Sequence, residues 1–374
     1  MNSRERILAA INHQQPDRVP IDLGAHGSSG LSFVAYHNLV RYLGLNHLPN
    51  QVHDVVQQLS QPPMELLDFF GADVVDVGRH FNQVPGYWHE IELLKGVPAQ
   101  YPHWFKPEKQ PDGSWLAPNK DGLYVGKMPV GATFFDQLIF PWKDGFPDDF
   151  SCFGEDSKKT VWGGMGFTPY DWMDEPHFWE MLREKTIDLR SKTDKALMLS
   201  VGCNLFENGT FIRRIDNFLM DLYLEPEKVH EFLDALLERH LDFLGKVCAA
   251  VGDVVDILKF GDDLGTNNGP FFPAETYAEF FKPRHKQLTD YAKKHSSAHT
   301  MLHVCGGIYE LIPELIEAGF EIINPVQISA INMEPERLKR EFGKELTFWG
   351  GGCDTNTILN NATPQQVKDH VKRN

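Results

Sequence analysis

The sequence lacks an excess of positive charge, a long apolar run and a targeting segment. Its 374 residues carry a formal net charge of −16, which argues against a nucleic acid or an anionic membrane as the main partner. No stretch of about 18 apolar residues occurs, and charged residues occupy the N-terminus where a signal peptide would need an apolar stretch. We therefore expect a soluble cytoplasmic protein whose partner is a small molecule or another protein.

Two nucleotide-binding motifs and a disulfide framework are also missing. No strand candidate is followed by GxGxxG, and GxxxxGK[ST] does not occur. These absences argue against a nucleotide-binding protein with an open α/β sheet. Cysteine is scarce, and the five residues are Cys152, Cys203, Cys248, Cys305 and Cys353. An odd number scattered over a long chain is unlike a disulfide framework, and a reducing cytosol leaves such thiols free for metal binding or catalysis.

What the sequence does contain is a regular alternation of short apolar runs and helical segments. The strand candidates are residues 18–24, 71–78, 196–202, 253–263, 299–307, 320–327 and 345–354. The alternation predicts a (β/α) barrel or a doubly wound sheet, and the missing nucleotide motifs favour the barrel. The predicted fold class is α/β, a TIM (β/α)8 barrel in a single domain over residues 1–374. Residues 80–195, rich in aromatics and DG turns, are expected to form a β-rich excursion after the second strand.

Polar residues at the C-terminal ends of barrel strands form the active-site face. His303 and Cys305 end the fifth strand candidate, and their two-residue spacing points both side chains to one face. Cys353 follows the seventh apolar run, so a barrel would bring it to the same face. One imidazole and two thiolates suit zinc, and a set of three protein ligands leaves a position for substrate. The spacing alone leaves open that the pair simply fills the core, because cysteine is among the most buried residue types.

Further polar residues follow two other strand candidates. Asp262 and Asp263 end the fourth, where carboxylates can orient a substrate, act as acid or base, or contact the metal histidine. One of the two could equally cap the following loop. Asn324 and Gln327 follow the sixth candidate, and their amides suit hydrogen bonds to a ligand.

Four segments resemble successive landmarks of the uroporphyrinogen decarboxylase superfamily. They are "RERILAAINHQQPDRVPIDLG", "DDLGTNNGPFFPAETYAEFFKPRHKQL", "LHVCGGIYELIPELIEAGFEIINPVQ" and "LKREFGKELTFWGGGCDT". The resemblance extends over nearly the whole chain and implies a (β/α)8 barrel with its site at the C-terminal face. Members of the superfamily normally continue with a Gly-rich eighth strand and a final helix. We therefore expect that this sequence stops before its eighth βα unit.

The resemblance implies different chemistry for two branches of the superfamily. In the decarboxylases, arginines of an RQAGRY-type motif follow the first strand and hold tetrapyrrole carboxylates, whereas "IDLGAHGSSG" has no arginine here. Asp76 could match the aspartate that contacts pyrrole nitrogens in that branch. The other branch contains zinc-dependent, corrinoid-linked methyltransferases similar to methylcobalamin:coenzyme M methyltransferase. Its His-x-Cys motif with a distant cysteine matches His303, Cys305 and Cys353.

By this resemblance the chain is a zinc methyltransferase that works with a corrinoid protein carrying a methyl-corrinoid. It would move a methyl group to a thiol, or from a methylated substrate such as a methyl ether, and either direction is compatible with the sequence. Asp262 and Asp263 would take supporting catalytic roles, while Asn324, Gln327 and Asp76 would bind substrate. Two alternatives remain: a decarboxylase-like enzyme acting on a tetrapyrrole or other polycarboxylate, and a non-catalytic barrel that only docks the corrinoid protein. The sequence is also compatible with a homodimer.

Overall fold

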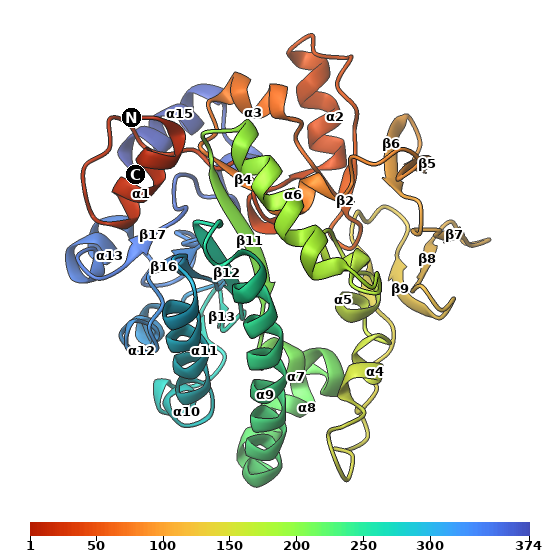
Figure 1. The fold of residues 1–374 in the computed structure, drawn as a ribbon, viewed down its shortest axis with the longest axis vertical. Coiled ribbons are helices and arrows are strands. Elements are labelled where there is room, and N and C mark those ends of the chain that lie inside the picture. Colours follow the sequence, from red (N-terminus) through yellow and green to blue (C-terminus); the bar gives the residue numbers. More distant parts are fainter.

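A curled sheet of six parallel strands forms the centre of the computed structural model, which describes residues 1–374 (Figure 1). Its strands are β4 (Val74–Asp76), β11 (Ala196–Gly202), β12 (Ile257–Gly261), β15 (His299–His303), β16 (Ile322–Asn324) and β17 (Thr347–Phe348). The order across the sheet is β17-β16-β15-β12-β11-β4, and every pairing is parallel. This half barrel confirms the predicted TIM-like α/β fold.

Helices connect the strands and cover the outer face of the sheet (Figure 1). The helices before β11 are α1 (Ser3–Ile11), α2 (Phe33–Tyr42), α3 (Met64–Phe70), α4 (Phe153–Ser157), α5 (Val161–Gly164) and α6 (Phe178–Lys192). Those after it are α7 (Phe206–Arg213), α8 (Ile215–Leu224), α9 (Pro226–Val251), α10 (Ala274–Phe280), α11 (Lys282–His295), α12 (Ile312–Glu317), α13 (Pro335–Phe342), α14 (Ile358–Asn361) and α15 (Pro364–Arg373). None of them combines the length and the apolar character needed to cross a membrane.

Alternate residues of each strand pack on opposite faces of the sheet. Leu197, Leu258 and Leu302 point outward into a core of 54 buried residues shared with the helices. The inner face contributes to a separate core of nine buried residues, which fills the inside of the barrel. Its members are Ile7, Ile11, Ala25, Val74, Ala196, Met198, Ile257, Met301 and Ile322. Burial on both faces is typical of a parallel sheet.

The prediction of a strand at residues 18–24 is wrong. The carbonyl of Ile21 accepts a hydrogen bond from the Asp73 backbone (2.7 Å), but the Ile21 N–H donates to the Asp73 side chain (2.8 Å). The Asp73 carboxylate therefore accepts the Ile21 N–H hydrogen bond that would otherwise go to a neighbouring strand. Farther along, the Asp22 carboxylate accepts from Trp349 Nε1 (2.9 Å), just after β17. The segment thus crosses the opening between β4 and β17 without forming a strand ladder.

The β-rich part of the chain is antiparallel. Its strands are β1 (Leu31–Ser32), β2 (Val52–Asp54), β3 (Leu59–Ser60), β5 (Trp88–Leu94), β6 (Val97–Pro102), β7 (Glu108–Lys109), β8 (Trp115–Pro118), β9 (Tyr124–Met128) and β10 (Asp136–Gln137), and a small hairpin, β13 (Gly265–Thr266) and β14 (Gly269–Pro270), follows β12. A core of 14 buried residues joins residues 33–56 to residues 93–165, so the β-rich part also includes chain that precedes β4. Tyr101, Phe105 and Phe135 are fully buried in this core, where they pack against one another.

Candidate metal centre

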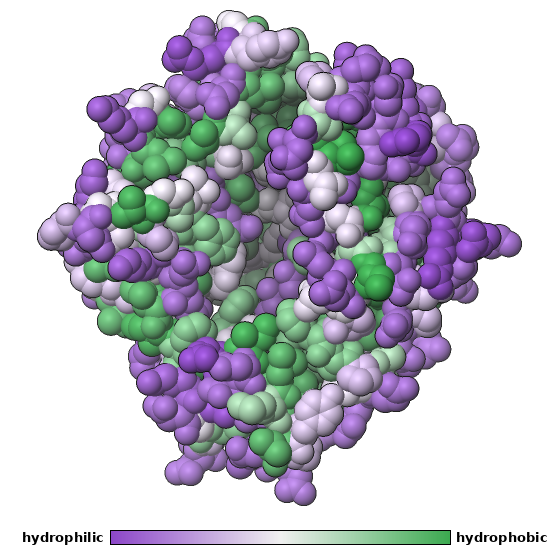
Figure 2. Space-filling view, turned by 180° about the vertical axis from the view of Figure 1, so that it is seen from behind, coloured by the Kyte–Doolittle hydropathy of each residue, from purple (hydrophilic) through white to green (hydrophobic).

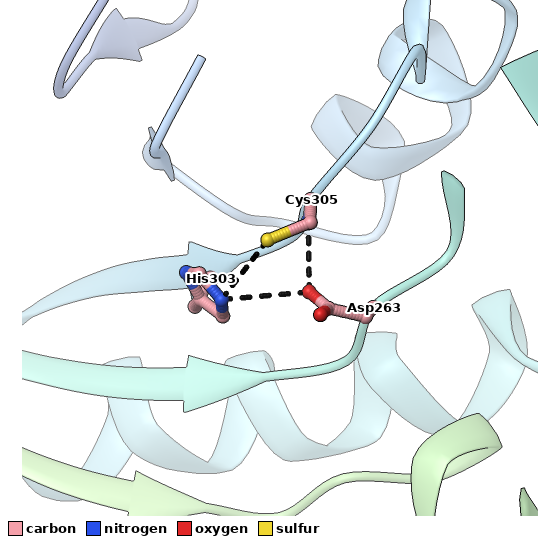
Figure 3. Close-up of side chains that lie close together, drawn as sticks. All are labelled: Asp263, His303 and Cys305. Carbon is pink, nitrogen blue, oxygen red and sulfur yellow. Dashed lines mark hydrogen bonds and ion pairs between the residues drawn. The ribbon is translucent and has the colours of Figure 1, made fainter. Parts of the chain in front are cut away.

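Three side chains with metal-binding atoms converge at the C-terminal ends of β12 and β15 (Figure 3). His303 is the last residue of β15, Cys305 follows it in the loop, and Asp263 lies just after β12. Their ligand atoms all lie within 4.8 Å of one another. His303 Nε2 is 3.4 Å from Cys305 Sγ and 3.5 Å from Asp263 Oδ1, and the Cys305 backbone N–H donates to Asp263 Oδ1 (2.8 Å). The predicted His303/Cys305 pair therefore forms one cluster with Asp263.

Asn324 fixes the orientation of the His303 ring. The amide nitrogen of Asn324 donates to the carbonyl of Trp349 (3.0 Å), which leaves Asn324 Oδ1 to accept from His303 Nδ1 (2.9 Å). With its proton on Nδ1, the imidazole directs the lone pair of Nε2 toward Cys305 and Asp263. Neutral histidine held in this way by an outer hydrogen bond is the usual form of a metal ligand. The structure thus places Asn324, predicted to bind substrate, against the histidine.

Burial disfavours the charged form of every group in the cluster. It raises the pKa of the Cys305 thiol, and the neighbouring charge of Asp263 raises it further. Burial also raises the pKa of Asp263 and lowers that of His303, the latter with the help of the Lys259 charge. A divalent cation would reverse this preference, because it stabilises a thiolate and a carboxylate directly. Nitrogen, sulfur and oxygen donors in this geometry fit zinc.

Two further ionisable side chains belong to the site, and the sequence analysis assigned a role to neither, although Glu207 follows the third strand candidate. Glu207 lies in the first turn of α7 and accepts from Asn204 Nδ2 (2.6 Å). Burial, together with the charges of Asp263 and Asp262, raises the pKa of Glu207 to about 8. Lys259 lies in β12 on the inner face of the barrel, two residues after Ile257. A lysine inside the apolar run "DILKFG" was the signal that could have revealed it.

The two neighbouring aspartates have different positions. Asp262 is fully buried, and its carboxylate accepts hydrogen bonds from three backbone N–H groups at the start of α7. The donors are Leu205 (3.2 Å), Phe206 (3.0 Å) and Glu207 (2.8 Å). Asp262 therefore anchors α7, whereas Asp263 faces the metal-binding atoms.

Three more of the predicted site residues, besides Asp262 and Asn324, lie outside the cluster. Cys353 is in the loop after β17, where its only polar contact is a weak one to the Asp354 carbonyl (3.7 Å). Gln327 Oε1 accepts from the backbone of Gly306 (3.1 Å), so it holds the loop that carries Cys305. Asp76 ends β4, which β11 and β12 separate from β15, and burial raises its pKa to about 7.

Comparison with known proteins assigns the part of the chain that carries this cluster. Residues 199–374 match the family described as Uroporphyrinogen decarboxylase (URO-D). These residues belong to the uroporphyrinogen decarboxylase superfamily. The matched part contains β12, β15, β16 and β17, and with them His303, Cys305 and Cys353. The family resemblance seen in the sequence is thereby confirmed over residues 199–374.

Among the solved structures that are similar to this chain, one aligns along the full length. A methyltransferase from Methanosarcina mazei aligns with 100% of this chain and 98% of its own chain, with 13% sequence identity and a TM-score of 0.49. Among curated proteins, none matches the chain by sequence.

Proposed function

We propose that the chain is a zinc-dependent methyltransferase of a corrinoid system. It moves a methyl group between a corrinoid protein and a small thiol or methylated substrate. The observation that carries the proposal is the convergence of His303 Nε2, Cys305 Sγ and Asp263 Oδ1 at the C-terminal ends of barrel strands. When bound there, zinc supplies Lewis acidity, which lowers the pKa of a coordinated thiol or polarises the oxygen of a methyl ether.

The proposed ligands are His303, Cys305 and Cys353. Cys353 is outside the cluster, but no strong contact holds its sulfur elsewhere, and its loop follows the strand next to β16. Asp263 is the carboxylate already beside the other two ligand atoms, so it suits the remaining position until a substrate takes it. A site of this composition keeps one place exchangeable, as catalytic zinc requires.

The decarboxylase alternative loses support at the loop around residues 21–30. This loop has no arginine to bind a polycarboxylate, and it places Ser28 Oγ 2.9 Å from His303 Nδ1 instead. The loop thus contributes a hydroxyl to the metal-binding histidine. This arrangement favours metal chemistry over the binding of several carboxylates.

Zinc content and methyl transfer test the proposal together. Purified wild-type protein should hold zinc in stoichiometric amount, and His303→Ala, Cys305→Ser and Cys353→Ser should each lose most of it. The same variants should lose methyl transfer between methylcobalamin and a thiol, followed by the cobalamin absorbance. Cys152→Ser is the matched control, because Cys152 lies at the start of α4, outside the cluster. Full methyl transfer by metal-free protein would show the proposal to be wrong.

A further inference from the structure

Lys259 lies inside the barrel, below the metal cluster, and its ammonium group has no contact partner. Strand pairing places Lys259 beside Met301, while Gly261 pairs with His303, so Lys259 is one layer below the metal-binding histidine. Ile257, the preceding residue on the same face, belongs to the core inside the barrel. Acidic groups act on the Lys259 ammonium through charge at longer range, but none forms a hydrogen bond or an ion pair with it.

The acidic groups around Lys259 are already engaged by other donors. Asp54 accepts from Gln57 Nε2 (2.8 Å), Glu207 from Asn204 Nδ2 (2.6 Å), and Asp263 from the Cys305 backbone (2.8 Å). Lys259 is half-buried, and an ammonium group on the inner face of the barrel without a contacting anion is not explained by the packing of the fold. The presence of the Lys259 ammonium beside the metal cluster is explained if a bound ligand supplies the anion that contacts it.

His26 is a second polar side chain without a hydrogen bond in the same region. It is only 3% exposed, and neither of its ring nitrogens has a hydrogen-bond partner, although Asp22 Oδ2 lies 3.2 Å from Nε2. The charge of Lys259 contributes to the lowered pKa of His26, after burial, and His26 acts in the same way on His303. The three basic side chains therefore influence one another through charge, although they come from separate elements.

We propose that Lys259 binds a carboxylate group of the substrate, so that the substrate is a small acid that also bears the reacting thiol or methylated group. The inference rests on the proposed function, because it places the other end of the substrate at the metal cluster. Lys259 precedes Gly261, the residue that pairs with His303, by two residues, which is one inward-facing layer and about 7 Å along the strand direction. The carboxylate and the reacting atom are thus a few bonds apart. His26 can supply one further polar contact to such a ligand.

Three thiols of similar size and different charge test this inference on the zinc-loaded protein. They are 3-mercaptopropionate, 2-mercaptoethanol and cysteamine, which are anionic, neutral and cationic at the end opposite the thiol. Isothermal titration calorimetry should show that wild-type protein binds 3-mercaptopropionate at least about tenfold more tightly than 2-mercaptoethanol, and cysteamine most weakly, as expected for a charge-assisted contact. Lys259→Met should abolish this preference and leave the affinity for 2-mercaptoethanol unchanged.

Two further variants separate a binding role from a structural one. Lys259→Arg keeps the positive charge and should retain the preference for the acid. Lys246→Met is the control, because Lys246 pairs with Asp242 on the exposed surface of α9 and should change nothing. Zinc content and melting temperature are measured for every variant. Loss of zinc or of 2-mercaptoethanol binding in Lys259→Met would overturn the inference, because Lys259 would then serve the metal cluster itself.

The same titrations distinguish failure of the inference from failure of the proposed function. Equal binding of all three thiols by wild-type protein would overturn the carboxylate subsite while the zinc site stands. Binding of none of them by zinc-loaded protein would overturn the proposed function, and the inference with it.

Discussion

His303 Nδ1 lies 2.9 Å from Asn324 Oδ1, and Asn324 in turn donates to the carbonyl of Trp349 at 3.0 Å. This chain of two hydrogen bonds crosses from the end of β15 over β16 to the residue after β17. It sets the tautomer of the histidine through contacts that lie outside the metal cluster.

Seen from behind relative to Figure 1, the surface of the molecule is hollowed near its middle (Figure 2). Both polar and apolar residues surround this hollow.

Replacement of Asn324 tests this relationship. Asn324→Ala removes the amide acceptor of His303 Nδ1 and leaves that atom only the Ser28 hydroxyl, which can donate as well as accept. The ring therefore loses its fixed tautomer, and zinc affinity should fall by roughly 10- to 100-fold. Competition with a chromogenic chelator measures this change. Asn12→Ala is the control, because Asn12 is exposed and bonds only near the end of α1. Unchanged zinc affinity in Asn324→Ala would mean that the histidine is oriented by other contacts.

Replacement of Asp262 and of Asp263 by asparagine should affect different properties of the protein: the first its stability, the second its zinc affinity. Asp262→Asn places an amide donor against the backbone N–H groups of α7, so the free energy of unfolding should fall by roughly 1–3 kcal/mol. Asp263→Asn keeps an oxygen that can accept from Cys305, so it should cost less than about 1 kcal/mol but lower zinc affinity. Urea unfolding and chelator competition give the two readouts. Equal effects of both changes on zinc would contradict this division.

The hydrogen bond between Trp349 and Asp22 should stabilise the closure between β17 and the N-terminal segment. Trp349→Phe keeps an aromatic ring beside the inner core but removes the donor to Asp22, whose side chain is only 8% exposed. We expect the free energy of unfolding to fall by about 1–3 kcal/mol, because a buried carboxylate loses a donor. Trp162→Phe, in the separate core of the β-rich part, serves as the control for the loss of ring size. Similar losses in both variants would argue against a special role for the Asp22 contact.

The sheet could be predicted from the sequence where local pattern determines structure. The run at residues 196–202 became β11 with the same bounds, because its apolar residues are buried on both faces. Residues 18–24 have a similar apolar pattern, yet Val19 is 81% exposed. The structure of that segment depends on the carboxylates of Asp73 and Asp22, whose partners are far away in the sequence. Local pattern carries no information about such partners.

The candidate site was predictable to the extent that strand ends could be located. The spacing of His303 and Cys305 indicated a shared face, and the structure shows their side chains in contact. Which of the two aspartates joins them depends on the path of the chain after β12, where Asp262 is bound to α7. Lys259 was missed because only the ends of strands were searched, although the alternation within β12 already placed it on the inner face.

Glu321 should make the stability of the protein depend on pH at a place outside the metal cluster. Burial alone would raise its pKa, but hydrogen bonds from His299 Nδ1 (2.9 Å) and the Thr300 backbone (2.9 Å) outweigh burial and lower the pKa from 4.5 to about 2. Because the folded-state pKa is depressed, this contribution to stability is present above about pH 4.5 and is lost as the pH falls toward 2.

Glu321→Gln should therefore be less stable than wild type at pH 7, and the difference should shrink as the pH falls from about 4.5 to 3. Urea unfolding of both proteins at each pH measures the difference directly. Glu310→Gln is the matched control, because Glu310 is exposed and should give no pH-dependent difference. A difference between Glu321→Gln and wild type that stays constant from pH 7 to pH 3 would show that the carboxylate charge is not what stabilises this contact.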